Sequence, residues 1–208
     1  MTRPLLVSSS RLIPAVVTCG LAACVSNKAV AFTSRVNLAH AAPIDGMLVM
    51  NVQSSGLDAA LYQGFEIGLT QRLGSCGVRA RVLHGPAAQL DPALDAGKVI
   101  QPVAVMSIEL ASPPSIHAIG FSSRVSAVFA LKLEDITSRQ TIWVARSKLE
   151  FFLHADAKFG AWFATQVVSR LRDDGVLTDC PATAAGWPEV DLPPDPAAAV
   201  PPTEPSPP

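Results

Sequence analysis

The sequence predicts an α+β domain, a two-layer sandwich in which a mostly antiparallel sheet of about five strands is covered on one face by two long helices. Three observations predict this class. One stretch alternates with the period of a half-buried hairpin, two others repeat with the period of amphipathic helices, and the elements follow the order β-α-β-α-β-β-β-α. The chain has 208 residues, of which 49% are hydrophobic. This is enough to bury one core, with room for tails.

The hairpin is predicted at residues 123–153. In each of its halves, apolar side chains fall on one face and charged side chains on the other, which is typical of strands with one buried face. The polar break between the halves is rich in residues that close an antiparallel turn. Placing the two apolar faces together sets Leu133 opposite Trp143 and Val125 opposite Phe151. A slip by one residue would turn the large apolar side chains outward, so the register is expected to be firm.

Two long segments have the helical period. From 58 to 76, and again from 157 to 174, an apolar residue recurs every three or four positions, so each segment is predicted to be an amphipathic helix. Asp156 is placed to cap the second helix at its start. Gly77 and Gly175 follow the two segments, where a left-handed residue commonly ends a helix. The inward residues are Leu61, Phe65, Leu69, Leu73 and Cys76 in the first helix, and Phe159, Phe163, Val167 and Leu171 in the second.

Two shorter strands are predicted on either side of the first helix. Residues 47–53 are mostly apolar, and we expect them to be the first strand, with Leu48, Met50 and Val52 facing the core. The serines and glycine that follow end this strand. Residues 78–82 alternate apolar residues with arginines, which predicts a second strand.

Between the second strand and the hairpin, the sequence predicts a short helix and a third strand. Asp91 and Pro92 have the pattern of an N-cap followed by proline at the first helical position, so residues 90–97 are expected to be helical. Residues 103–110 have the composition of a strand. The pair of prolines that follows stops this strand, so residues 111–122 are expected to form a loop.

The first 23 residues have the features of an export signal. Arg3 and Arg11 give a positively charged start, and the uncharged run at 12–23 is too short to span a bilayer as a helix. The run ends in Leu-Ala-Ala-Cys24, which resembles a bacterial lipobox. That resemblance implies removal of residues 1–23 as a signal peptide and attachment of acyl chains to Cys24. Two or three such chains suffice for lasting membrane anchorage.

The residue after the lipobox cysteine is Val25 rather than aspartate. By resemblance to sorting in Gram-negative lipoproteins, this favours the periplasmic face of the outer membrane as the location of the anchored protein. Residues 24–43 have no periodicity, and we expect them to be a tether. The alternative is an ordinary secretory signal that is cleaved after Ala41.

The four cysteines agree with an exported protein. Cys19 leaves with the signal peptide, and Cys24 becomes the lipid carrier. Cys76 and Cys180 then remain as an even pair in an oxidising compartment, where disulfides persist. We expect a disulfide that closes a loop of about a hundred residues and stabilises the fold by roughly 4 kcal/mol in the chain-entropy model. The alternative is a pair of buried free thiols.

The folded domain is predicted to occupy residues 44–180. Beyond it, residues 181–208 contain ten of the eighteen prolines and four acidic residues, with no lysine or arginine. Proline fixes φ and removes a hydrogen-bond donor. This segment is therefore expected to be an extended, disordered and unpacked tail.

Composition and motifs argue against several functions. The net charge of -1 lacks the basic excess that nucleic-acid-binding proteins carry. The sequence has no P-loop, no G-x-G-x-x-G and no G-x-S-x-G, so the scaffolds for nucleotide, dinucleotide and acyl-transfer chemistry are missing. No Cys/His spacing indicates a metal site. We therefore expect a protein that is not an enzyme and that uses no metal or cofactor.

Two motifs carry a further resemblance. Residues 131–143 read as strand, Asp, threonine-containing turn, strand and Trp, and residues 69–78 join a helix to a strand through glycine. With the lipobox and the element order, they resemble small envelope lipoproteins of Gram-negative bacteria. These are the auxiliary lipoproteins of ABC-type transporters, the lipoprotein partner in lipopolysaccharide transport, and the lipoprotein activators of penicillin-binding proteins.

The resemblance implies a non-catalytic accessory subunit of an envelope transport or biogenesis machine, anchored to the membrane through N-terminal acyl chains. A carrier of a lipid or another apolar ligand and a regulator of cell-wall synthesis remain as alternatives. Phe152 and Trp162 fall off the inward faces of their elements, and exposed aromatic residues are typical of docking sites. Arg146 and Lys148 lie on the outer face of the hairpin. These four residues are the predicted contact with an envelope protein complex.

Overall fold

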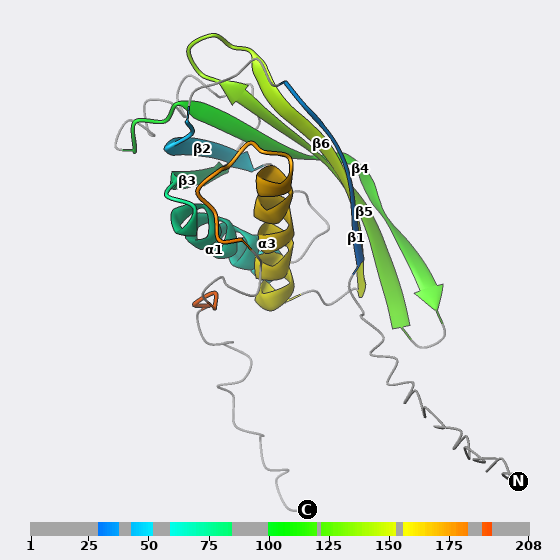
Figure 1. Ribbon diagram of the computed structural model, residues 1–208. Helices are drawn as coiled ribbons and strands as arrows, with labels where there is room; N and C mark the ends of the chain where they lie inside the picture. Colours follow the sequence, from blue (N-terminus) through cyan, green and yellow to red (C-terminus); the bar gives the residue numbers. More distant parts are fainter. Residues whose placement is uncertain are drawn as a thin grey trace, which may run out of the picture.

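The computed structural model describes residues 29–37, 43–51, 59–84, 100–119, 122–152, 156–182 and 189–192. Over these residues the chain forms one six-stranded sheet, and α1 and α3 pack together on one of its faces (Figure 1). The predicted α+β class is confirmed. The elements are β1 (Ala29–Val36), β2 (Gly46–Asn51), α1 (Ala59–Ser75), β3 (Arg79–His84), β4 (Ala104–Ile119), β5 (Ser122–Asp135), β6 (Thr141–Phe152) and α3 (Ala157–Asp173).

The sheet is mixed, so the prediction of a mostly antiparallel sheet of about five strands is wrong. The strand order is β1-β6-β5-β4-β2-β3. The pairs β1–β6, β6–β5 and β5–β4 are antiparallel, whereas β2 is parallel to both β3 and β4. Helix α1 connects β2 to β3, and such a helical crossover joins parallel strands. The helix predicted at 90–97 lies outside the described residues.

The tether predicted at 24–43 is wrong for residues 29–36, which form β1. All eight residues pair with β6. Phe32 and Val36 pack against the core, while Thr33 and Arg35 are exposed. The hairpin predicted by the sequence left the outer edge of β6 unpaired, and unpaired strand edges recruit a further strand.

The hairpin of β5 and β6 has the predicted register. Leu133 lies opposite Trp143, and Val125 lies opposite Phe151. All four side chains are buried. The turn between the strands is held by the Asp135 carboxylate, which accepts hydrogen bonds from the Ser138 backbone N–H at 2.6 Å and from the Ser138 hydroxyl at 2.9 Å.

The loop predicted at 111–122 is wrong, because β4 continues to Ile119 and pairs with β5 over its whole length. The register shifts between Leu110 and Ser112 and again between Ser112 and Ser115. Pro113 and Pro114 lie within the second of these irregularities, where their missing N–H groups interrupt no regular ladder. The prolines therefore bend the strand without ending it.

Strand β2 faces opposite to the prediction. Met47 and Val49 join the main core beneath the helices. Leu48 and Met50 instead form a small second cluster with Val105 on the other face of the sheet. A strand that is buried on both faces is apolar throughout, so its sequence has no alternation to indicate which face meets the helices. Val52, also predicted to face inward, lies outside the described residues.

Both long helices are confirmed, and every inward residue predicted for them is buried. The Asp156 side chain accepts a hydrogen bond from the Phe159 backbone N–H at 2.8 Å and caps α3. Gly77 and Gly175 follow the two helices, and both have a φ of 74°. This left-handed conformation is the one expected of a glycine that ends a helix.

Helices α1 and α3 approach each other backbone to backbone. A Cβ atom at Gly64 would collide with the carbonyl oxygen of Ala157, and one at Gly160 would collide with the carbonyl oxygen of Leu61. Glycine is the residue that permits such an approach. The helix pair therefore depends on two missing side chains as well as on its buried apolar stripe.

A polar network fixes α3 to the sheet. The indole N–H of the fully buried Trp143 donates to Asp174 at 2.7 Å. Arg170 donates to the same carboxylate at 2.9 Å and to the Ser34 hydroxyl of β1 at 2.7 Å. The end of α3 is thus bonded to β6 and, through Arg170, to the edge strand β1.

One part of the predicted tail packs on the domain. Of residues 181–208, the structure describes 181–182 and 189–192. Asp191 lies against α1, where its backbone N–H donates to the Gln71 side chain at 3.0 Å and its carbonyl accepts from Gln71 at 3.4 Å. The expectation of an unpacked tail is therefore wrong for Asp191.

Candidate functional site

The helices cover one face of the sheet, and in β1, β5 and β6 the opposite face is covered by no described element (Figure 1). We call this opposite face the outer face. Along β6 the odd-numbered side chains from Trp143 to Phe151 are buried, while Arg146 and Lys148 are exposed. This alternation is the one predicted from the sequence, and it directs the charged side chains of the hairpin to the outer face.

A groove of about 540 Å³ crosses β1, β6 and β5 on the outer face. Two neighbouring rows of the sheet build it. In the first row, Val144 pairs with Arg35 on one side and with Lys132 on the other. In the second row, Arg146 lies between Thr33 and Ala130. We call the site formed by Arg35, Lys132 and Arg146 around the small apolar side chains of Val144 and Ala130 the cationic groove.

The three cations of the groove differ in their partners. Lys132 forms an ion pair with Glu134 at 2.8 Å. Arg35 and Arg146 are exposed and form no ion pair or side-chain hydrogen bond with any described residue. A guanidinium group presents several N–H donors in one plane and binds carboxylate or phosphate oxygens in pairs. The groove is therefore suited chemically to an anionic partner.

The predicted contact residues Arg146, Lys148 and Phe152 all lie on the outer face of β6. Lys148 bonds Glu150 at 2.9 Å, and Arg124 lies 3.6 Å from the same carboxylate. The hydrogen bond and charge of Lys148 lower the pKa of Glu150, and Arg124 acts in the same direction. Phe152 is half-buried, with the guanidinium carbon of Arg124 5.8 Å from the centre of its ring.

Trp162 does not lie beside Phe152. Its ring packs against Phe159 of the same helix, with 5.2 Å between the ring centres, and Phe159 in turn packs against Phe151 at 4.8 Å. Phe151 points to the helices, so its neighbour Phe152 points to the outer face. The structure therefore places Phe152 and Trp162 on opposite sides of the sheet, and they do not form one patch.

Arg35 and Lys132 are the two groove cations that were not among the predicted contact residues. Lys132 lies in β5, within the predicted hairpin, whereas the strand of Arg35 was not predicted. For Arg35 the reason is its position. It lies in β1, within the segment expected to be a tether. The alternation of Phe32, Ser34 and Val36 with Thr33 and Arg35 was available as a signal. It is weak because small and polar residues occupy both faces of this strand.

The predicted cysteine pair is a disulfide in the structure. Cys76 and Cys180 are bonded, and their Cα atoms lie 4.1 Å apart. The bond joins the end of α1 to the segment that follows α3. Cys24, the predicted site of lipidation, lies outside the described residues.

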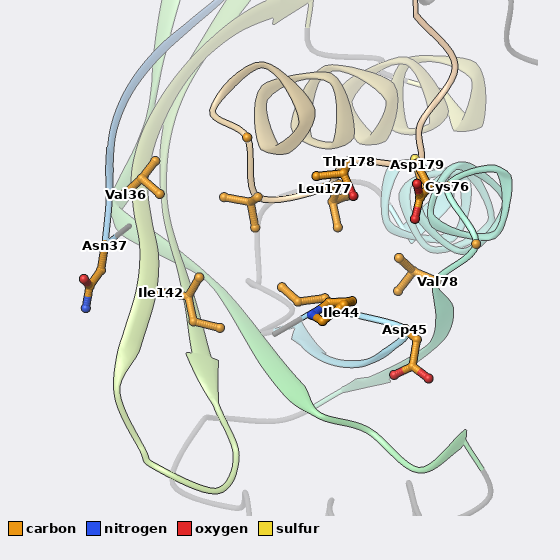
Figure 2. A pocket seen from close by; sticks show the side chains of 14 residues that line it. Val36, Asn37, Ile44, Asp45, Cys76, Val78, Ile142, Leu177, Thr178 and Asp179 are labelled. Carbon is orange, nitrogen blue, oxygen red and sulfur yellow. The ribbon is translucent and has the colours of Figure 1, made fainter. Parts of the chain in front are cut away.

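A pocket of about 310 Å³ lies beside this disulfide (Figure 2). We call it the disulfide pocket. Two polar residues, Asn37 and Asp45, lie at its border, and Figure 2 shows their side chains pointing away from the enclosed space. Asp45 is bonded to Arg79 at 3.1 Å. The apolar side chains around the space come from β1, β6, the segment before β2 and the segments after the two helices. They include Val36, Ile44, Val78, Ile142 and Leu177.

The described part of the chain lacks two further features. There, no group of three or more His, Cys, Asp or Glu side chains could hold a metal ion. Among the same residues, no helix is both long and apolar enough to cross a membrane.

No protein-family model and no curated protein matches this chain. Solved structures that are similar include the PelC dodecamer from Paraburkholderia phytofirmans, with 15% identity, 70% of this chain and 96% of PelC covered, and a TM-score of 0.44. Lipoprotein GNA1162 from Neisseria meningitidis has 14% identity, covers 62% of this chain and 98% of its own, and gives a TM-score of 0.39. The hypothetical protein CT253 from Chlamydia trachomatis is 16% identical. The match covers 51% of this chain and 71% of CT253, with a TM-score of 0.29. The structural neighbours thus include a protein named as a lipoprotein.

Proposed function

We propose that this chain is a lipid-anchored periplasmic lipoprotein of the outer membrane, and that it is a non-catalytic accessory subunit of an envelope transport or biogenesis machine. The observation that carries the proposal is the cationic groove. It places three cations on a sheet face that the helices leave uncovered, and two of them have no described partner.

The chemistry of the groove supports a protein partner with an acidic surface. A docking site commonly has a small apolar centre and a polar rim, and arginine is enriched in such sites. Here Val144 and Ala130 supply the apolar centre, and Arg35 and Arg146 supply the rim. Complementary charge steers the partners together and fixes their relative position.

Two features support the compartment. The apolar run that ends at Cys24 resembles a lipobox, and the Cys76–Cys180 disulfide suits an oxidising space such as the periplasm. An anchor raises the local concentration of the domain for partners at the same membrane. Replacing Cys24 by serine is expected to abolish labelling by a radioactive fatty acid and to leave uncleaved precursor. Normal processing of the Cys24→Ser protein would contradict the anchor.

The docking proposal is tested by site-specific photocrosslinking in intact envelopes. A photoreactive residue at Val144 is expected to capture an envelope protein. The combined change Arg35→Ala and Arg146→Ala should reduce that capture by an order of magnitude or more, since removal of an interface hot spot costs about 2 kcal/mol. Melting temperatures should stay unchanged because both side chains are exposed.

The matched control is Lys158→Ala, which removes an exposed cation from α3, on the opposite side of the sheet. Capture should be the same with this variant as with the natural sequence. If the double arginine variant also captures the partner normally, the outer face is not the docking site. The identity of the captured protein separates a transport role from regulation of cell-wall synthesis.

The disulfide pocket favours a second candidate, a carrier of a small apolar ligand. Its volume of about 310 Å³ would admit part of an acyl chain, with apolar contacts such as Ile142 and Leu177 and with Thr178 and Asp179 as polar residues of the lining. Binding of a fluorescent fatty acid, displaced by an unlabelled one and weakened by Ile142→Trp, would support this function. Binding that is unaffected by Ile142→Trp would place the ligand elsewhere.

A further inference from the structure

The end of the β4–β5 hairpin and the start of β1 point in the same direction. Ala29, at the start of β1, pairs with Glu150, which pairs with Ser126, which pairs with Ser115. These four residues form one row across the sheet. Beyond this row β4 continues for four more residues, to Ile119, and Figure 1 shows this end extending on the side from which the chain enters β1. At about 3.3 Å per residue, the hairpin end reaches roughly 13 Å beyond the row.

The chain before β1 is short. Only residues 25–28 separate Cys24 from Ala29. Five steps of an extended chain cover at most about 18 Å. An acylated Cys24 sits at the bilayer surface, so the row of Ala29 lies within about 18 Å of the lipid headgroups. The hairpin end extends beyond that row on the same side, and Ile116 is the first residue of β4 beyond the row, so both are within reach of the membrane surface.

The side chains at the hairpin end have the chemistry of a membrane contact. Ile116 is 59% exposed and, among the described residues, is one of only two large apolar side chains that are exposed. On the outer face of the same end, Arg124 packs over the ring of Phe152 and retains 37% exposure of its side chain. Ile116 pairs with the buried Val125 and so lies on the helix-facing side of the hairpin, while Arg124 and Phe152 lie on the outer face. An end with an apolar side chain on one face and cationic and aromatic groups on the other suits the boundary between acyl chains and headgroups.

We propose that this hairpin end is a second membrane contact, in which Ile116 enters the interface of a phospholipid bilayer and Arg124 meets its phosphate groups. The inference rests on the proposed lipid anchor at Cys24, because the anchor brings the hairpin to the bilayer. It adds an orientation to that function. The strands stand away from the membrane, and the cationic groove, four to six residues further along β1, faces the periplasm beside it.

The test measures the depth of a fluorophore in the full, lipidated chain. In the mature protein Cys24 is acylated and Cys76 is bonded to Cys180, so a cysteine introduced at Ile116 is the thiol available for labelling with an environment-sensitive dye. Val103→Cys is the matched control, because Val103 is the other exposed large apolar residue and lies at the opposite end of β4. The protein is reconstituted in vesicles of phosphatidylethanolamine and phosphatidylglycerol that contain a quencher on the acyl chains.

The dye at Ile116→Cys is expected to lose most of its emission to the quencher and to shift to the blue, and the dye at Val103→Cys to do neither. Ala118→Cys, also exposed near the hairpin end, serves as a second labelling site should Ile116→Cys fold poorly. Equal quenching at the two ends of β4 would overturn the inference. Failure of the anchor gives a different result, because a chain without fatty-acid label that does not float with vesicles contradicts the proposed function before depth is measured.

Discussion

At the residue scale, Asp174 has the most consequential polar contacts in the described core. Burial alone would raise the pKa of its carboxyl, but the hydrogen bonds from Ser34 and Trp143 and the charge of Arg170 outweigh this and lower the pKa below its ordinary value. A carboxyl whose pKa is lower in the folded than in the unfolded state stabilises the fold above its ordinary pKa, and this stabilisation is lost as the pH falls through the folded pKa.

Asp174→Asn is therefore expected to lower the melting temperature at neutral pH, by an amount that shrinks as the pH falls below about 4. Thermal unfolding followed by circular dichroism from neutral to acidic pH measures the difference. Asp173→Asn is the control, because this neighbouring carboxylate is more exposed and, among the described residues, bonds only the adjacent Arg172. A deficit for Asp174→Asn that is independent of pH would show that the network acts by shape rather than by charge.

At the element scale, the helix pair depends on the close approach at Gly160. Gly160→Ala places a methyl group against the Leu61 carbonyl, and forced overpacking of this kind typically costs about 1–3 kcal/mol. Gly74→Ala is the matched control in α1, because nothing lies within 4 Å of the added Cβ. There the gain in helix propensity is expected to stabilise by up to about 1 kcal/mol. Urea unfolding of both variants measures the contrast, and equal midpoints would mean that the helices can move apart at little cost.

Some features of these elements could be predicted from the sequence and others could not. The hairpin was predicted with its register because Leu133, Trp143, Val125 and Phe151 form a strict alternation, which one slip would destroy. The orientation of β2 could not be predicted, because burial on both faces removes the alternation. The glycine spacing of the helix contact was visible in the sequence, yet a glycine in a helix indicates close packing only when its partner helix is known.

The candidate site was predicted in part for the same reasons. Arg146 follows from the alternation of β6. Arg35 does not, because its strand becomes recognisable only once β6 is seen to have a free edge. The prediction that Phe152 and Trp162 belong to one contact surface was wrong. Each residue points away from the buried face of its own element, and this does not bring the two side chains together.

At the scale of the whole molecule, the disulfide joins the two helical segments of the domain. Cys76 and Cys180 are 104 residues apart in the chain. Cys180→Ser is expected to lower the free energy of unfolding by about 2–5 kcal/mol, the usual cost of removing a native disulfide. Denaturant unfolding measures this loss. Non-reducing electrophoresis should show a faster band for the natural protein than for the variant, and identical mobility would contradict the bond.

The pairing of β1 has a mechanical consequence. Its eight residues are hydrogen-bonded side by side to β6, and in an antiparallel pair those bonds run perpendicular to the strands. A pull on the proposed lipid anchor at Cys24 would enter the domain along β1, at Ala29. It would therefore load the whole row of bonds in shear instead of opening them one at a time, as a pull across the strand would. If the proposed partner in the cationic groove were drawn away from the membrane, the force would pass to the proposed anchor through the part of the sheet best arranged to resist it.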